Sequence, residues 1–213
     1  AWLSGMLHDV GRFEQIKRYN TFSDADSVDH AKFGADLLFK DGLISIFLKG
    51  MVKCTGYKPG ALEDRYGSDG VFLYDRLNKS DMEMLELAIR CHNMYRIPQG
   101  LNRREQAFCN VLRDADKVDI FKVNIDTPLE EIYNTTTEEL MKSDITDEVL
   151  EAFGEEHCIL KAIRRTPADT VIGHVSLAYE LVYDESVRIT VEQGYLGKLM
   201  HFHSDNEETN RKM

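Results

Sequence analysis

Apolar residues recur at helical spacing through most of the 213-residue chain. Helix-start signals separate these stretches, such as the capping box Ser80-Asp81-Met82-Glu83, which precedes an apolar helical face. Alternation of apolar and polar residues is scarce, and the one tempting run, residues 187–191, is too isolated to build a sheet. The pattern predicts an all-α fold, arranged as a single-domain helical bundle over residues 1–213.

The expected helices follow from these start and stop signals. Residues 1–10 are expected to close a helix that Gly11 terminates, and a loop or short irregular helix is expected to follow. Ser27 is expected to cap the next helix. The remaining expectations are a loop at residues 11–26, helices over residues 27–39, 43–53, 80–92 and 103–123, and a glycine-rich surface loop at residues 54–70.

The second half of the chain continues with helix signals. Thr166-Pro167-Ala168-Asp169 is typical of a helix start. Helices are expected over residues 144–153 and 166–184, and a terminal helix or a pair of short helices over residues 187–199. The polar tail after His203 is expected to be frayed. No linker is evident, so residues 124–213 are expected to complete the domain whose core is formed by residues 1–123.

Composition and charge limit the partners of the chain. Its formal net charge of -11 argues against a role on nucleic-acid backbones, which calls for basic patches. No apolar run approaches the length of a membrane span, and no secretory signal is evident at the start. The four widely spaced cysteines suit reduced thiols. We therefore expect a cytoplasmic protein with no nucleic-acid or membrane partner, and the sequence leaves open whether it forms a homodimer.

Histidines and aspartates of the first half form a candidate metal site. The doublet His8-Asp9 ends the first apolar helical segment, and His30, His92 and Asp116 each lie on an expected helix. A lone histidine on a helix is more often a satisfied core residue than a ligand, and a helical aspartate is usually solvated or a cap. Their conjunction favours a site, because imidazole and carboxylate together suit Zn, Mn or Fe.

The sequence around these residues resembles the HD-domain superfamily of metal-dependent phosphohydrolases over roughly residues 1–123. The doublet lies in Leu-His-Asp-Val-Gly-Arg, and the family's distant aspartate run is similar to Asp-Ala-Asp-Lys at residues 114–117. Members with two metals carry elements similar to residues 30–35 (His-Ala-Lys-Phe-Gly-Ala) and 88–92 (Ala-Ile-Arg-Cys-His). The resemblance implies an HD-type helical bundle.

The resemblance also implies a chemistry. It places two divalent transition-metal ions, Fe, Mn or similar, one on His8, Asp9 and Asp116 and the other on Asp9, His30 and His92. Two metals about 3.5–4 Å apart hold a hydroxide and polarise a phosphoryl group for in-line attack. The implied reaction is hydrolysis of a phosphoester or phosphoanhydride bond in a small, nucleotide-like phosphorylated substrate.

Three further residues have alternative roles. Asp114 competes with Asp116 as a ligand, but a spacing of two puts them on different helix faces, and the family's ligand precedes the lysine. Arg12 and Lys117 are candidate phosphate contacts alongside the catalytic Asp9, Arg12 as a bidentate fork and Lys117 as a point charge. The alternative for both is a solvent-facing surface charge.

Two features depart from the family pattern. The histidine expected on an earlier helix is not in this chain, so it lies upstream of Ala1 or the first metal lacks a ligand. Asn93 follows His92, and no Gly-Tyr-Pro lies near it, unlike in the HD-GYP cyclic-dinucleotide phosphodiesterases. The remaining set resembles HD proteins that cut dinucleoside polyphosphates. The alternative function is a non-catalytic nucleotide-binding or sensor domain with an incomplete metal site, and a purely structural scaffold is a third.

Overall fold

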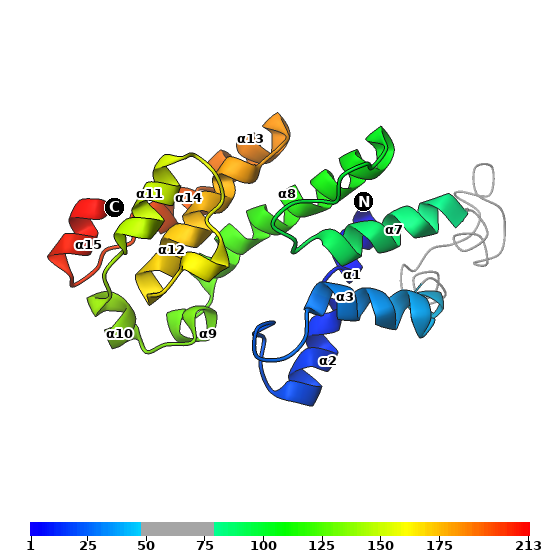
Figure 1. Cartoon of the computed structure of the whole chain (residues 1–213), viewed down its shortest axis with the longest axis horizontal. Coiled ribbons are helices and arrows are strands. Elements are labelled where there is room, and N and C mark those ends of the chain that lie inside the picture. The colour runs from blue at the N-terminus through cyan, green and yellow to red at the C-terminus, as the bar shows by residue number, and fades with distance from the viewer. Residues whose placement is uncertain (48–78) are drawn as a thin grey trace. The chain divides into compact units, whose positions relative to one another are not determined.

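The computed structural model describes residues 1–47 and 79–213, and the regular elements in these two ranges are all helices (Figure 1). The all-α prediction is confirmed. The chain divides into two compact units, Ala1–Leu112 and Arg113–Met213, and the boundary falls inside the long helix α8 (Arg103–Asp126). The single domain over residues 1–213, with its division after residue 123, stays a prediction. Within the described ranges, no helix combines the length and the apolar character needed to cross a membrane.

The first unit is built around a short central helix. That helix, α3, packs against both α2 and α7, and α1 packs against α7. The helices are α1 (Trp2–Leu7), α2 (Val10–Tyr19), α3 (His30–Ala35) with its π-helical continuation (Asp36–Lys40), α7 (Lys79–Cys91) and the start of α8. Their inward faces form one apolar cluster of Leu7, Ala35, Leu38, Ile44, Leu85, Ala88, Ile89, Cys109 and Leu112.

The predicted helix stop at Gly11 is wrong. The first helix ends at Leu7, and α2 runs through Gly11, which is buried. A Cβ atom on Gly11 would lie 2.2 Å from the carbonyl oxygen of His30 and 2.7 Å from the backbone nitrogen of Gly34. The glycine therefore permits a close crossing of α2 and α3 instead of ending a helix. The loop or short irregular helix predicted at residues 11–26 is a regular α-helix as far as Tyr19, and the loop follows at residues 20–29.

The predicted cap of α3 is also wrong. Asp29 is the N-cap, and its carboxylate accepts the backbone N–H of Lys32 at 3.2 Å. The hydroxyl of Ser27 instead donates to the carbonyl oxygen of Ser23.

The helices predicted over residues 80–92 and 103–123 are confirmed as α7 and α8. Of the helix predicted over residues 43–53, residues 44–47 are helical; the rest, with the loop predicted at 54–70, lies outside the described residues.

The second unit is centred on α12 (Pro167–Val175). This helix begins at the predicted position, with a capping box between Thr166 and Asp169, but it ends well before residue 184. Residues of α12 contribute to two apolar clusters. One cluster consists of Phe121, Leu140, Val171, Val175 and Leu199, and the other of Ile145, Val149, Ile159, Ala168 and Ile172. The other helices are α9 (Leu129–Tyr133), α10 (Thr137–Lys142), α11 (Asp147–Gly154), α13 (Asp184–Gln193), α14 (Tyr195–Met200) and α15 (Glu207–Lys212).

The tail after His203 is helical, so the predicted fraying is wrong. Asn206 caps α15 by accepting the backbone N–H groups of Glu208 and Thr209. The buried hydroxyl of Thr209 donates to the carbonyl oxygen of Ser143 at 2.7 Å, just beyond the end of α10. Polar residues hold this tail through backbone carbonyl groups that a helix end leaves unsatisfied.

Candidate metal centre

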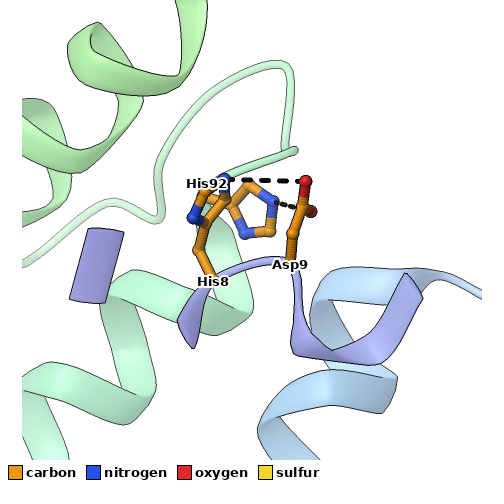
Figure 2. Close-up of side chains that lie close together, drawn as sticks. All are labelled: His8, Asp9 and His92. Atoms are coloured by element: carbon orange, nitrogen blue, oxygen red, sulfur yellow. Dashed lines mark ion pairs between the residues drawn. The ribbon is translucent and has the colours of Figure 1, made fainter. Parts of the chain in front are cut away.

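The His-Asp doublet lies at the joint between two helices. His8 directly follows α1, and Asp9 occupies the N-cap position of α2. An N-cap aspartate ordinarily accepts a backbone N–H from the first turn, but the side chain of Asp9 makes no such bond. The carboxylate lies instead beside the imidazole rings of His8, His30 and His92. Figure 2 shows its ion pairs with His8 and His92.

Each of three histidines is oriented through its Nδ1 atom. Nδ1 lies 2.7 Å from the carbonyl oxygen of Gly5 in His8 and 2.7 Å from that of Ile89 in His92. Because a carbonyl oxygen only accepts hydrogen bonds, Nδ1 carries the hydrogen in both rings. In His30, Nδ1 lies 2.7 and 2.9 Å from the two carboxylate oxygens of Asp24. In the neutral form of each ring, Nε2 therefore bears the lone pair that a metal requires.

The Nε2 atoms and the Asp9 carboxylate converge. Nε2 of His30 lies 3.1 Å from Nε2 of His92 and 3.2 Å from Oδ1 of Asp9. Oδ1 is also 3.6 Å from Nε2 of His92, and Oδ2 is 3.7 Å from Nε2 of His8. Ligand atoms on a common ion, each at about 2.0–2.1 Å from it, lie about 3–3.5 Å apart. The spacing around His30, Asp9 and His92 therefore suits a shared ion.

Asp9 contributes a buried carboxylate oxygen, Oδ1, that lacks a hydrogen-bond donor in the described part of the chain. About half of its side chain is exposed (49%), but Oδ1 is buried and has no hydrogen-bond partner among the described residues. A buried acceptor without a donor is costly. Burial also raises the pKa of Asp9, but the neighbouring rings of His30, His92 and His8 outweigh this effect and hold the pKa well below its usual range. Asp9 is therefore ionised at neutral pH, as a metal ligand must be.

His30 lies between two carboxylates. Burial lowers the pKa of its imidazole, but the carboxylates of Asp24 and Asp9, 2.7 and 3.2 Å from its two ring nitrogens, outweigh burial and raise the pKa above its ordinary value. Its side chain is almost completely buried (4% exposed). The surroundings of His30 thus favour a positive charge at this place, which either a proton or a bound cation provides.

Arg12 lies at the edge of the centre, and its guanidinium is engaged within the protein. Nη1 donates to the carbonyl oxygen of Phe22 at 2.6 Å and to Oδ1 of Asp24 at 3.0 Å, and Nε lies 3.8 Å from Oδ1 of Asp9. These bonds tie α2 to the loop at residues 20–29. The phosphate contact of Arg12 stays a prediction.

The remaining predicted residues belong to the second unit. Asp114 is buried, and its carboxylate accepts the backbone N–H groups of Val182 and Tyr183 at 3.0–3.1 Å. This structural use argues against Asp114 as a ligand. The role of Asp116, which is partly exposed on the same helix, stays a prediction.

Lys117 is buried, so the solvent-facing alternative for this residue is wrong. Its Nζ donates to the carbonyl oxygen of Glu180 at 3.3 Å. Burial lowers the pKa of its ammonium group, and the charge of Arg113 adds to the effect. Its contact with a phosphate stays a prediction.

Sequence reasoning missed two residues that support the centre, Asp24 and Gln15. Asp24 accepts from His30, and Gln15, which is fully buried, donates to Asp24 and to the loop backbone at Val28. Asp24 lies in an irregular loop, where no periodic pattern distinguishes it from Asp26. The one local sign is the group of three aspartates, Asp24, Asp26 and Asp29, shortly before His30.

Comparisons of the chain with protein-family models, with curated proteins and with solved structures found no match. The geometry establishes a group that can hold a metal ion: one ligand atom from each of His8, Asp9 and His92 lies within 4.8 Å of the others. His30 adjoins this group through His92 and Asp9.

Proposed function

We propose that this centre binds divalent transition-metal ions and that the protein is an HD-type hydrolase of a small, nucleotide-like phosphorylated compound. One observation carries the metal proposal. Imidazole nitrogens from three segments of the chain meet at a carboxylate whose Oδ1 is buried without a hydrogen-bond donor. Lone pairs so close together repel one another unless a proton or a metal ion lies among them, and a metal ion satisfies all of them at once. The reaction class follows from the sequence resemblance.

The donor set favours particular ions. Histidine nitrogen and aspartate oxygen suit Fe, Mn or Zn, whereas thiolate would favour softer ions. The three cysteines in the described ranges, Cys91, Cys109 and Cys158, are buried thiols, and none belongs to the group around Asp9. We therefore expect Fe or Mn, or a similar divalent ion, in the centre.

The arrangement of Asp9 supports two ions. Oδ1 faces His30 and His92, and Oδ2 faces His8. A carboxylate whose oxygens face different imidazoles is suited to bridge two ions. In this proposal His30 and His92 hold one ion with Asp9, and His8 holds the other with Asp9.

A bound divalent ion would supply Lewis-acid polarisation of a phosphoryl oxygen and activation of water. The protein's own residues prepare the site for this. Hydrogen bonds at Nδ1 orient the three imidazoles, and ionised Asp9 supplies negative charge for the cations. In this proposal Arg12, whose Nε lies 3.8 Å from Oδ1 of Asp9, adds a fixed positive charge that would attract a phosphorylated substrate.

The first experiment is elemental analysis of protein purified without chelator or affinity-tag metal. About two equivalents of Fe or Mn per chain would support the dinuclear centre. About one equivalent would indicate a mononuclear relative, in which some of these histidines contact substrate. Absence of metal after reconstitution would favour the alternative, a nucleotide-binding or sensor domain.

The Asp9→Ala variant tests the assignment of the bridging ligand. We expect it to lose bound metal and hydrolysis of nucleotides and dinucleoside polyphosphates, with helical content by circular dichroism unchanged, because Asp9 makes no cap bond. Asp26→Asn is the matched control, since Asp26 is an exposed carboxylate outside the centre. Full activity in Asp9→Ala would contradict the bridging role.

A further inference from the structure

Asp24 is the most heavily hydrogen-bonded carboxylate in the loop that joins α2 and α3. Both of its oxygens lie within hydrogen-bond distance of Nδ1 of His30, at 2.7 and 2.9 Å. Oδ1 also accepts from Nη1 of Arg12 and from Nε2 of Gln15, each at 3.0 Å. Oδ2 accepts from Nδ2 of Asn93 at 3.3 Å. Four side chains thus donate to one carboxylate.

These donors come from different segments of the first unit and are themselves fixed. Gln15 is fully buried on α2, and its amide group also donates to Ser27 and to the carbonyl oxygen of Val28. Asn93 follows His92 directly and also donates to Asp29 at 3.0 Å. Asp24 is therefore held from both sides of the centre, by α2 and by the segment that carries His92.

We propose that Asp24 is a positioning residue that fixes the tautomer and the ring orientation of His30, so that its Nε2 is presented as a metal ligand. This inference rests on the proposed metal centre. Asp24 itself does not face the converging ligand atoms: its oxygens face Nδ1, on the opposite side of the ring from Nε2.

A carboxylate suits this position better than an amide side chain. An ionised carboxylate only accepts hydrogen bonds, so Nδ1 of His30 must carry the hydrogen and Nε2 the lone pair. An amide could turn its NH₂ group toward Nδ1, which would move the hydrogen to Nε2 and remove a metal ligand. The negative charge of Asp24 also makes the imidazole a stronger donor to a metal.

The experiment compares Asp24→Asn with Asp29→Asn. Asp29 lies in the same segment and shares Asn93 as a donor, but its carboxylate accepts from the backbone of Lys32 where that of Asp24 accepts from Nδ1 of His30, and asparagine is equally suited to its N-cap position. Mn²⁺ affinity is measured by competition with a chelator, and the His30 tautomer in metal-free protein is read from ¹⁵N chemical shifts of labelled histidine. The His30→Gln variant identifies the His30 signals.

We expect Asp24→Asn to bind Mn²⁺ about 10–100-fold more weakly than the unaltered protein, with the hydrogen of His30 shifted to Nε2. Asp29→Asn should match the unaltered protein in both measurements. Unchanged affinity and an unchanged tautomer in Asp24→Asn would overturn the proposal and leave the metal centre intact. If the unaltered protein binds no metal, the proposed function fails, and the tautomer alone decides the role of Asp24.

Asp24→Glu provides a second test if the asparagine variant does not fold. It keeps a charged group that only accepts hydrogen bonds, but one methylene longer, so it should keep the hydrogen on Nδ1 while displacing the ring. We expect weaker Mn²⁺ binding with an unchanged tautomer. A hydrogen on Nε2 of His30 in this variant would contradict the proposal.

Discussion

His30 in the first unit and His174 in the second are both held through Nδ1 by a side-chain oxygen, yet their surroundings differ. For His30 the oxygen belongs to the carboxylate of Asp24, and its Nε2 faces Asp9 and His92. For His174 the oxygen belongs to the neutral amide of Asn124, at 2.7 Å, and the ring lies against Tyr133. Within the described part of the chain, no comparable group of ligand atoms surrounds His174.

The two histidines consequently differ in charge. The pKa of His30 is raised by its two carboxylate neighbours, despite burial. Burial lowers the pKa of His174 to about 3, and the positive charges of Arg164 and Lys161 add to the effect. A histidine suited to bind a cation and a structural one are thus distinguished by the charge of the Nδ1 partner and by what Nε2 faces.

The strongest test of this comparison replaces each histidine by glutamine. We expect His30→Gln to lose one metal equivalent or to bind Mn²⁺ at least about 10-fold more weakly, because one of the converging nitrogens is removed. His174→Gln should bind metal like the unaltered protein. Equilibrium dialysis with elemental analysis measures the metal bound by each variant. Equal losses of metal in the two variants would contradict the assignment of His30 as a ligand and His174 as a structural residue.

The glycines beside the two histidines provide a second test. A Cβ atom on Gly11 meets backbone at 2.2 Å, the carbonyl oxygen of His30, whereas one on Gly173 meets the guanidinium of Arg164 at a similar distance. Backbone in a helix crossing cannot turn aside, but a long side chain can. We expect Gly11→Ala to lower the free energy of unfolding by about 3 kcal/mol and Gly173→Ala by about 1 kcal/mol.

Urea unfolding of both variants measures these losses. Gly5→Ala is the control, because nothing lies within 4 Å of a Cβ atom at that helical position. It should stabilise the protein slightly through helix propensity. A larger loss in Gly173→Ala than in Gly11→Ala would show that the α2–α3 crossing tolerates a methyl group.

The third test concerns the pH dependence of stability. A pKa of about 3 in the folded state, against about 6.5 in the unfolded chain, means that only the unfolded state gains a proton at His174 as the pH falls below 6.5. The folded state is therefore penalised progressively between about pH 6.5 and pH 3. At pH 5 the penalty is about 2 kcal/mol, and it is absent at pH 8.

Thermal or urea unfolding of the unaltered protein and His174→Gln at pH 8 and pH 5 isolates this penalty. Other groups titrate in both proteins and cancel in the difference. We expect the glutamine variant to gain about 2 kcal/mol relative to the unaltered protein on going to pH 5. A difference that does not change with pH would mean that His174 accepts a proton in the folded protein.

The long helices were predictable because their signals are local. The positions of α7 and α8 follow from apolar periodicity, and the start of α12 follows from Thr166 and Pro167. Gly11 was misread because one property of glycine, its lack of a side chain, serves both helix ends and close helix crossings. Sequence alone does not distinguish these uses, because the deciding atoms belong to α3.

The candidate site was predictable only in part, for a related reason. The four histidine and aspartate residues of the first unit lie in sequence runs that resemble one family. The contact between His30 and His92 and the supporting role of Asp24 depend on tertiary structure. Asp24 lies in an irregular loop, and the donors that surround it come from residues 12, 15, 30 and 93. No spacing rule connects these positions.

His30 and His92, whose Nε2 atoms lie 3.1 Å apart, are separated by 62 residues in the sequence. An ion bound to both would act as a crosslink that closes a long loop of the chain, and unfolding would have to release it. The free energy of unfolding would then rise with the logarithm of the free metal concentration. Metal shortage would therefore reduce the amount of folded protein, and thermal stability would serve as a measure of metal supply.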